Sequence, residues 1–348
     1  MHSQQTGGKT DRTGPPKAFA PMDRGKGRTL RIVALGGGTG LATLLTGLKK
    51  YVGPQGPLEP EELTALVTVT DDGGSSGRLR RDFRMLPPGD IRNCMVALSE
   101  DAALLARLFR YRFASGRGLK GHSFGNLFLT ALTHVTGDFA EAVKLSSEVL
   151  AIRGQIFPST TQNVTLRATL EDVRRVDGET RITASKGRIR RIELVPPNAR
   201  PLPEALRAVE EADLITIGPG SLFTSMIPNL LVRGMAKKIR QSKATKVFIC
   251  NLMTQPHESI GLTAAQHVEA IHDHAGGKLI NWVVLNGKAV SPALLEKYRR
   301  QGADQVRNDL EALDRLGVGY IVEDLLVEDR VARHDPDKLA QLLLLRIP

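Results

Sequence analysis

The chain has 348 residues, 41% hydrophobic and 24% charged, which is typical of a globular protein with one large α/β domain or two smaller ones. A net charge of +11 is compatible with a phosphorylated ligand, but an aromatic content of 4% argues against a base-stacking platform, so we expect no nucleic-acid partner. The two cysteines lie far apart outside a CxxC pattern, which indicates a reducing compartment. No run approaches the ~18 apolar residues of a membrane span, and no signal peptide opens the chain. We expect a cytoplasmic protein without a membrane span.

The first 28 residues differ in composition from the rest of the chain. They consist mainly of Gly, Pro, Thr, Gln and basic residues without periodicity. Such a segment cannot bury enough apolar surface to fold, so the sequence predicts a disordered basic tail over residues 1–28 and one domain over 29–348.

The domain begins with a short apolar strand over 30–35, followed by a glycine-rich turn and a helical repeat of leucines. The free N–H groups of a helix N-terminus and its dipole both favour phosphate. The alternative is a turn whose glycines only tighten the chain. The turn lacks the third glycine of the dinucleotide pattern, so we expect a nucleotide or phosphate rather than NAD specifically. The candidate ligand-binding residues are Gly36, Gly37, Gly38, Thr39 and Gly40.

The stretch from Val67 to Asn93 carries more acids, glycines and hydroxyls than a simple connection needs. It begins as an apolar strand expected over 66–70. Connections as long as the remainder usually serve a site, so we interpret it as an active-site or ligand-binding loop rather than a solvated linker. It closes with a Pro-Pro-Gly turn into a helix that Asp90 is expected to cap. The candidate ligand-binding residues are Asp71, Asp72, Gly73, Gly74, Ser75, Arg78, Asp90, Arg92 and Asn93. The adjacent acids Asp71 and Asp72 are also candidate Mg²⁺ ligands.

Residues 90–150 have helical periodicity, and His122 and Asn126 lie at one predicted helix start beside glycines. A capping or core role for the histidine is the alternative, but because glycines flank the two residues we take His122 and Asn126 as candidate ligand-binding residues. The sequence pattern then changes from helical to strand-like over residues of about 155–200. A period-two run over 164–170 and further strands expected at 181–183 and 189–194 predict a small antiparallel β insertion.

The α/β alternation resumes after Pro203. Strands expected at 213–217 and 246–250 each end in a polar turn, which adds the candidates Gly218, Gly220, Ser221, Thr254 and Gln255. The histidines at 267, 272 and 274 lack metal-pair spacing and are interpreted as surface residues. The last strand is expected at 320–322, before a closing helix that ends at Leu345. The turns at 36–40, 71–78 and 218–221 should meet at the C-terminal edge of one parallel sheet.

Six motifs occur in order: GGGTGL, VTVTDDGGSSGRLR, PPGDIRN, GHSFGNL, GPGSL with IPNLL, and NLMTQP. In these motifs the chain resembles the gluconeogenesis-factor family, a bacterial branch of the CofD-like superfamily, over residues 30–345. The resemblance implies an α/β, Rossmann-like, mostly parallel sheet with helices on both faces and an inserted small antiparallel subdomain. It implies binding of UDP-N-acetylglucosamine, with Tyr298 and Arg333 matching the family's UDP-sugar contacts.

The resemblance also implies a regulator of cell shape and of cell-wall precursor supply during gluconeogenic growth. Such a regulator would act through a partner protein of amino-sugar or cell-wall synthesis, and we expect a homo-oligomer. The sister branch, 2-phospho-L-lactate transferase, uses a guanosine diphosphate donor and Mg²⁺. The chain departs from that enzyme where it reads Asp71-Asp72-Gly73-Gly74-Ser75-Ser76 in place of an Asn-Thr-Gly-Asp-Asp order. A binding regulator to which no cofactor is assigned is therefore favoured, with a Mg²⁺-dependent phosphotransferase as the alternative.

Overall fold

The computed structural model of the chain describes residues 30–53, 56–99 and 104–347, and the predicted basic tail lies outside these residues. Seven strands form one sheet in the order β10-β9-β8-β7-β1-β2-β3, and all neighbouring pairs are parallel. The strands are β1 (Ile32–Gly36), β2 (Leu63–Val67), β3 (Gln155–Pro158), β7 (Leu214–Ile217), β8 (Thr245–Ile249), β9 (Trp282–Asn286) and β10 (Gly319–Glu323). The predicted Rossmann-like parallel sheet is confirmed.

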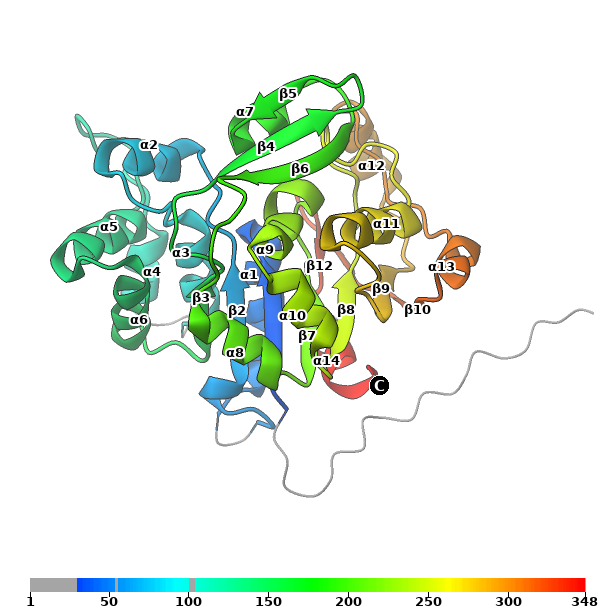
Figure 1. Cartoon of the computed structure of the whole chain (residues 1–348), viewed down its shortest axis with the longest axis horizontal. Coiled ribbons are helices and arrows are strands. Elements are labelled where there is room, and N and C mark those ends of the chain that lie inside the picture. The colour runs from blue at the N-terminus through cyan, green and yellow to red at the C-terminus, as the bar shows by residue number, and fades with distance from the viewer. Residues whose placement is uncertain (1–29, 54–55, 100–103, 348) are drawn as a thin grey trace, which may run out of the picture.

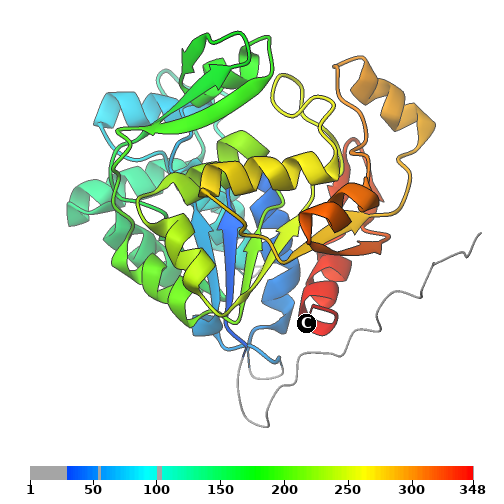
Figure 2. The same ribbon diagram turned by 45° about the vertical axis from the view of Figure 1, so that its right-hand side comes forward.

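Helices cover both faces of this sheet (Figures 1 and 2). One face carries α1 (Gly38–Leu48), α3 (Gly89–Leu98) and α14 (Pro336–Leu345), and the other carries α8 (Pro203–Glu211), α9 (Ile227–Leu231), α10 (Met235–Gln241) and α11 (Ala264–Ala275). The spacing of leucines 41, 44, 45 and 48 explains why α1 is a helix that faces the core, since all four are fully buried. Each such leucine contributes about 1.5–3 kcal/mol relative to an exposed one. No helix of the described residues is long and apolar enough to cross a bilayer.

The strand order fixes where a ligand can bind. From β1 the chain continues to β2 and β3 on one side, whereas β7 to β10 extend the sheet on the other side. The strand order therefore reverses between β1 and β7, and in open α/β sheets ligands bind in the crevice at this topological switch point. The amide of Gly218 donates to the carbonyl oxygen of Leu35 at 2.9 Å, so the two strands end side by side. The glycine turns that follow β1 and β7 are thus neighbours.

The sequence predicts a long loop between β2 and α3, and this prediction is wrong for the middle part of the segment. Strand β2 ends at Val67 rather than at Thr70, and residues 74–83 form helix α2 (Gly74–Phe83). The glycines and serines are typical of loops, but Ser75, Ser76 and Leu79 are buried, and this packing outweighs their weak helix propensity. Asp90 lies in the first turn of α3 and does not cap it, because the N-cap residue is Pro88.

The small antiparallel sheet is present, although its elements differ from those expected. It consists of β5 (Arg175–Asp177), β4 (Thr165–Leu170) and β6 (Ile189–Val195), and it stands above the C-terminal ends of the parallel strands (Figure 1). Residues 181–183 belong to helix α7 (Glu179–Ala184) instead of a strand, since Asp72 accepts hydrogen bonds from the amide and hydroxyl of Thr180 and thereby stabilises the helix start. Residues 155–158 fall inside the expected bounds of the insertion, but they form strand β3, which pairs with β2 in the parallel sheet.

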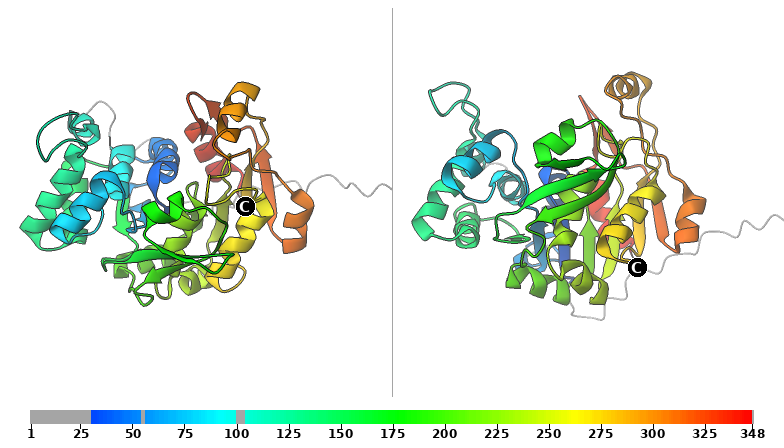
Figure 3. Two further views of the ribbon diagram at one scale, coloured as in Figure 1. Left: turned by 90° about the horizontal axis from the view of Figure 1, so that it is seen from above. Right: turned by 45° about the horizontal axis from the view of Figure 1, so that its top comes forward.

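Two further groups of helices complete the fold. Helices α2, α4 (Leu104–Arg110), α5 (Phe124–Thr136) and α6 (Phe139–Val149) lie together on the β3 side of the sheet (Figure 3). Helices α12 (Pro292–Arg299) and α13 (Leu310–Leu316) lie on the β10 side. Short helical turns occur at Lys49–Tyr51, Pro60–Glu62 and Leu222–Met226. Strand β10 is not the last strand, because the hairpin β11 (Leu326–Glu328) and β12 (Ala332–His334) follows it.

The surface assignment of the α11 histidines is wrong. His267 and His272 are buried, and His274 is half-buried. The Nε2 atoms of His272 and His274 accept the amides of Ile280 and Ile192 at 3.1 and 3.0 Å. These bonds hold the start of β9 and the inserted sheet against α11, so the histidines have structural roles that spacing on one helix does not reveal.

Candidate functional site

A cavity of about 420 Å³ lies at the switch point between β1 and β7. The sequence-predicted residues that line it are Gly37, Gly38, Thr39, Gly40, Asp90, Gly220, Ser221, Thr254, Gln255, Tyr298 and Arg333. Gly36 and Gly218 lie just behind the lining, at the strand ends. Thr43, Glu179, Ser225, Asn251 and His334 also line the cavity, and sequence reasoning did not include them as candidates.

The two glycine turns can approach each other because they lack side chains. A Cβ atom on Gly40 would lie 2.4 Å from the carbonyl oxygen of Pro219, which is far inside van der Waals contact. Gly38 has φ +62°, a left-handed backbone conformation that glycine adopts with little strain. The N-terminus of α1 therefore faces the cavity beside the second turn, and the dipole of an 11-residue helix favours an anion there.

The second turn is held by polar side chains from the end of β8. Asn251 makes a two-point contact with Gly220, since its Nδ2 donates to the carbonyl oxygen at 2.7 Å and its Oδ1 accepts the amide at 3.2 Å. Gln255 Nε2 donates to Ser221 Oγ at 2.7 Å, while Gln255 Oε1 is buried without a hydrogen-bond partner among the described residues. That oxygen is an acceptor available to a ligand N–H or O–H group.

Glu258 supports the same turn from behind. Its carboxylate accepts the amides of Phe223 and Thr224 at 2.8 and 3.1 Å, at the start of the π-helical turn that follows Ser221. Burial raises the pKa of Glu258 to about 7. No local sequence signal reveals this cap, because Glu258 lies 35 residues after the backbone group that it binds.

Two carboxyl groups lie at the edge of the cavity. A Cβ atom on Gly37 would lie 2.6 Å from Asp90 Oδ2, so the α3 carboxyl group packs directly on the first glycine turn. Burial and then the charge of Asp71 raise the pKa of Asp90 to about 7, although the amide of Gly38 donates to it. Burial and then Asp71 raise the pKa of Glu179, on the inserted α7, to about 9. Protonated carboxyl groups can donate to an oxyanion, whereas ionised ones repel it.

The opposite wall comes from elements late in the chain. Tyr298 on α12 is half-buried, and its hydroxyl accepts the amide of Ala332 at 3.0 Å, which ties the ring to β12. Arg333, the next residue of that strand, is exposed and lines the same cavity. His334 Nε2 donates to the carbonyl oxygen of Cys250 at 3.1 Å, and burial lowers the pKa of His334 to about 4, so the ring is neutral at pH 7.

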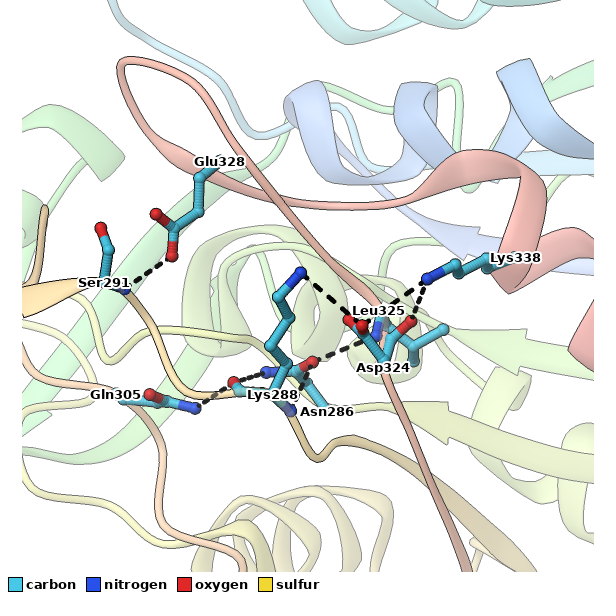
Figure 4. Close-up of polar contacts among 8 residues, drawn as sticks. All are labelled: Asn286, Lys288, Ser291, Gln305, Asp324, Leu325, Glu328 and Lys338. Carbon is cyan, nitrogen blue, oxygen red and sulfur yellow. Dashed lines mark hydrogen bonds and ion pairs between the residues drawn. The ribbon is translucent and has the colours of Figure 1, made fainter.

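A polar network fixes α12 and the β11–β12 hairpin to the parallel sheet (Figure 4). Asn286, at the end of β9, donates to the carbonyl oxygen of Lys288 at 2.6 Å and accepts the amide of Leu325 at 3.1 Å. Glu328 on β11 accepts the amide of Ser291, the N-cap residue of α12, at 2.7 Å. The elements that carry Tyr298 and Arg333 are thus held relative to β9 and to each other.

The paired acids after β2 lie beside the cavity and do not line it. Asp71 Oδ1 accepts the amide of Gly73 at 2.8 Å, and its Oδ2 faces Gly89. Asp72 Oδ1 accepts both the amide and the hydroxyl of Thr180, so this carboxylate is engaged by the inserted helix. The described residues contain no group of three or more His, Cys, Asp or Glu side chains arranged to hold a metal. Mg²⁺ is commonly held by one or two carboxylates together with ligand phosphates, and Asp71 fits that mode.

The remaining candidates form a separate cluster near the N-terminus of α5. The Ser75 hydroxyl lies 2.9 Å from His122 Nδ1 and accepts Asn126 Nδ2 at 3.1 Å, and all three residues are buried. The candidates Gly73, Gly74, Arg78, Arg92 and Asn93 do not line the cavity either. The structure therefore divides the predicted site residues between two neighbouring regions.

Comparisons with known proteins agree with this architecture. The family model described as "2-phospho-L-lactate transferase CofD" matches residues 32–326. The chain is 50% identical to a "Putative gluconeogenesis factor" of Nostoc sp. over 90% of this chain and 68% of that protein. It is 44% identical to the "Gluconeogenesis factor" of Bacillus subtilis over 91% of this chain and 98% of that protein.

The crystal structure of protein BH3568 from Bacillus halodurans superimposes with a TM-score of 0.87 at 44% identity, and the match covers 91% of this chain and 100% of that chain. The fold, the glycine turns at the switch point and the similarity to these relatives show that the chain belongs to the CofD family and, within it, to the gluconeogenesis factors.

Proposed function

We propose that the protein is a cytoplasmic regulator that binds UDP-N-acetylglucosamine in the switch-point cavity. Through a partner protein of amino-sugar or cell-wall synthesis, it would direct carbon into cell-wall precursors and maintain cell shape during gluconeogenic growth. One observation carries the proposal: the two glycine turns, Tyr298 and Arg333 all line the same cavity.

Each part of a nucleotide sugar has a complementary group in this cavity. The N-terminus of α1 presents backbone N–H groups for the diphosphate, the second turn adds the hydroxyl of Ser221, and Arg333 supplies a full positive charge. Tyr298 offers an aromatic face for the uracil. The free Oε1 of Gln255 suits a hydroxyl or the amide N–H of the sugar.

Calorimetric binding of UDP-N-acetylglucosamine to the wild type and to Arg333→Ala tests the proposal. Truncating a charge-assisted contact to phosphate costs about 2 kcal/mol, so the variant should bind roughly 30-fold more weakly. Arg330→Ala is the matched control, because Arg330 lies on the same hairpin but does not line the cavity. Equal affinities for Arg333→Ala and the wild type would remove Arg333 from the ligand site.

A Mg²⁺-dependent phosphotransferase is the second candidate function, and it is favoured by the family description and by the acids beside the cavity. Asp71 would hold the metal, which would neutralise charge on a nucleoside diphosphate. Phosphoryl-transfer enzymes can work by positioning and electrostatics alone. Incubation with a labelled UDP-sugar and with a guanosine-linked donor separates the two functions. Recovery of both compounds intact supports the regulator, whereas Mg²⁺-dependent product formation that Asp71→Asn abolishes supports the enzyme.

A further inference from the structure

Three arginines converge near the N-terminus of α5, outside the cavity lining. Arg78 extends from α2, and its Nη2 donates to the carbonyl oxygen of Lys120 at 2.9 Å. Arg112 lies between α4 and α5, and its Nη1 donates to the carbonyl oxygen of Gly121 at 2.6 Å. The two guanidinium groups therefore bind adjacent peptide units and flank the residue that follows, His122.

Arg92, on α3, supplies the third guanidinium group. Its stem packs against the start of α5, since a Cβ atom on Gly125 would lie 2.9 Å from Arg92 Cγ. The Nε atom of Arg92 is buried and has no acceptor among the described residues. Burial and then the charge of Arg112 lower the pKa of Arg92, so these two positive groups are close together. An unsatisfied buried donor costs about 1–3 kcal/mol, so an acceptor supplied by a ligand would be favourable here.

The buried cluster of Ser75, His122 and Asn126 borders the same region. Asn126 is only 2% exposed, and its Nδ2 donates to Ser75 Oγ at 3.1 Å, which holds the cluster together. Burial, Arg78 and Arg112 lower the pKa of His122, whereas Asp82 on α2 acts in the opposite direction. Around His122 the nearby positive groups thus outweigh the acid.

We propose that Arg78, Arg92, Arg112 and His122 form a second anion site that takes the phosphate group of a small molecule. Guanidinium groups match phosphate oxygens with two parallel hydrogen bonds, and a phosphate monoester carries nearly two negative charges at pH 7. A carboxylate carries only one negative charge and would therefore neutralise less of the positive charge of these arginines.

The first turn of α3 separates this site from the cavity. Asp90 packs on Gly37 at the cavity wall, whereas Arg92, two residues later, packs on Gly125 of α5. A ligand in the cavity and a phosphate at the arginine cluster would therefore contact different residues. The second site is independent of the proposed UDP-sugar function, and one can fail without the other.

An NMR titration of the full chain with inorganic phosphate tests the site through the imidazole signals of His122, which are assigned with His122→Gln. Bound phosphate should raise the pKa of His122 in a saturable manner, because a nearby anion stabilises the imidazolium. Arg112→Gln, which alters an exposed side chain, should weaken phosphate binding about tenfold. Thermal unfolding of each variant reports whether the fold is kept.

Two controls make the outcome decisive. Arg107→Gln removes an exposed arginine of neighbouring α4 and should leave the response of the His122 signal to phosphate unchanged, as should Arg333→Gln in the cavity wall. A His122 signal that does not respond to phosphate overturns the proposal. If Arg107→Gln weakened phosphate binding as much as Arg112→Gln, the binding would reflect only general surface charge. If Arg333→Gln weakened it, the phosphate would lie in the cavity. Either result also overturns the proposal.

Discussion

The two walls of the switch-point cavity are built in different ways. The wall after β1 and β7 consists of backbone, and its glycines allow the turn at Gly40 to lie against Pro219. The wall from α12 and β12 consists of the side chains of Tyr298 and Arg333, held by a network of polar contacts behind them (Figure 4). Backbone N–H groups bind any phosphate, whereas an aromatic ring and a guanidinium group depend on what surrounds the phosphate. The comparison suggests that the first wall provides affinity for a diphosphate and the second provides selectivity.

The largest expected effect comes from filling the backbone wall. Gly40→Val should reduce binding of UDP-N-acetylglucosamine at least 100-fold, because even the first side-chain atom would overlap the carbonyl of Pro219 and force the two turns apart. Calorimetry measures the affinity and thermal unfolding measures the stability. Gly137→Ala is a control for backbone strain, since Gly137 has φ +74° at the end of α5 with open space around it. It should lower stability but leave the affinity unchanged. Wild-type affinity in Gly40→Val would contradict the role of the turns.

Changes at Tyr298 test the side-chain wall with a smaller expected effect. Tyr298→Ala should weaken binding about tenfold, since stacking of a base on an aromatic ring contributes roughly 1–3 kcal/mol. Tyr298→Phe keeps the ring and removes only the acceptor for the amide of Ala332, so it should bind within a few-fold of the wild type. If binding of UDP-N-acetylglucosamine and of inorganic pyrophosphate weakened equally in Tyr298→Ala, the selectivity of this wall would be disproved.

The contact between Asn251 and Gly220 tests how much the backbone wall depends on its support. Asn251→Ala removes both hydrogen bonds to the turn and should reduce stability by about 1–2 kcal/mol and affinity a few-fold. Chemical unfolding and calorimetry report the two effects separately. Asn281→Ala is a matched control, because its Oδ1 accepts the amide of Lys246 at the start of β8, at the opposite end of the sheet from the cavity. It should cost stability without loss of affinity, and an equal loss in both variants would show a general effect of destabilisation.

The last prediction concerns stability rather than affinity, and it is a pH dependence from Asp90. Its pKa is about 7 in the folded chain and near 4 when unfolded, so the unfolded state releases its proton first as pH rises. Stability is therefore lost between about pH 4 and pH 7. Asp90→Asn should be more stable than the wild type at pH 8, by up to about 4 kcal/mol, and equal to it at pH 4. Unfolding curves at the two pH values check this, and a difference that does not change with pH would contradict it.

The parts of the site that local patterns encode are the parts that the sequence predicts. Apolar strands that run into glycine turns identify Gly37–Gly40 and Gly220, and parallel strand order explains why they meet. Contacts across long sequence distances are absent from the prediction. Asn251 and Glu258 hold backbone groups 31 and 35 residues away, and Asp72 stabilises the start of α7 from 108 residues away. The same contact explains why residues 181–183 form a helix rather than the expected strand.

The placement of Tyr298 and Arg333 follows from the family resemblance rather than from any pattern in the residues. The hairpin that carries Arg333 was not expected, because strands β11 and β12 have three residues each and show little alternation. Helix α2 was missed for a different reason. Its glycines and serines favour turns, and only burial against neighbouring helices stabilises them in a helix.

A crystal structure with UDP-N-acetylglucosamine would show directly whether the switch-point cavity holds the nucleotide sugar. The diphosphate should lie against the amides of the α1 N-terminus and the hydroxyl of Ser221, with the uracil on Tyr298 and the guanidinium of Arg333 within hydrogen-bonding distance of a phosphate oxygen. A nucleotide sugar bound elsewhere, with the switch-point cavity free of ligand, would contradict it.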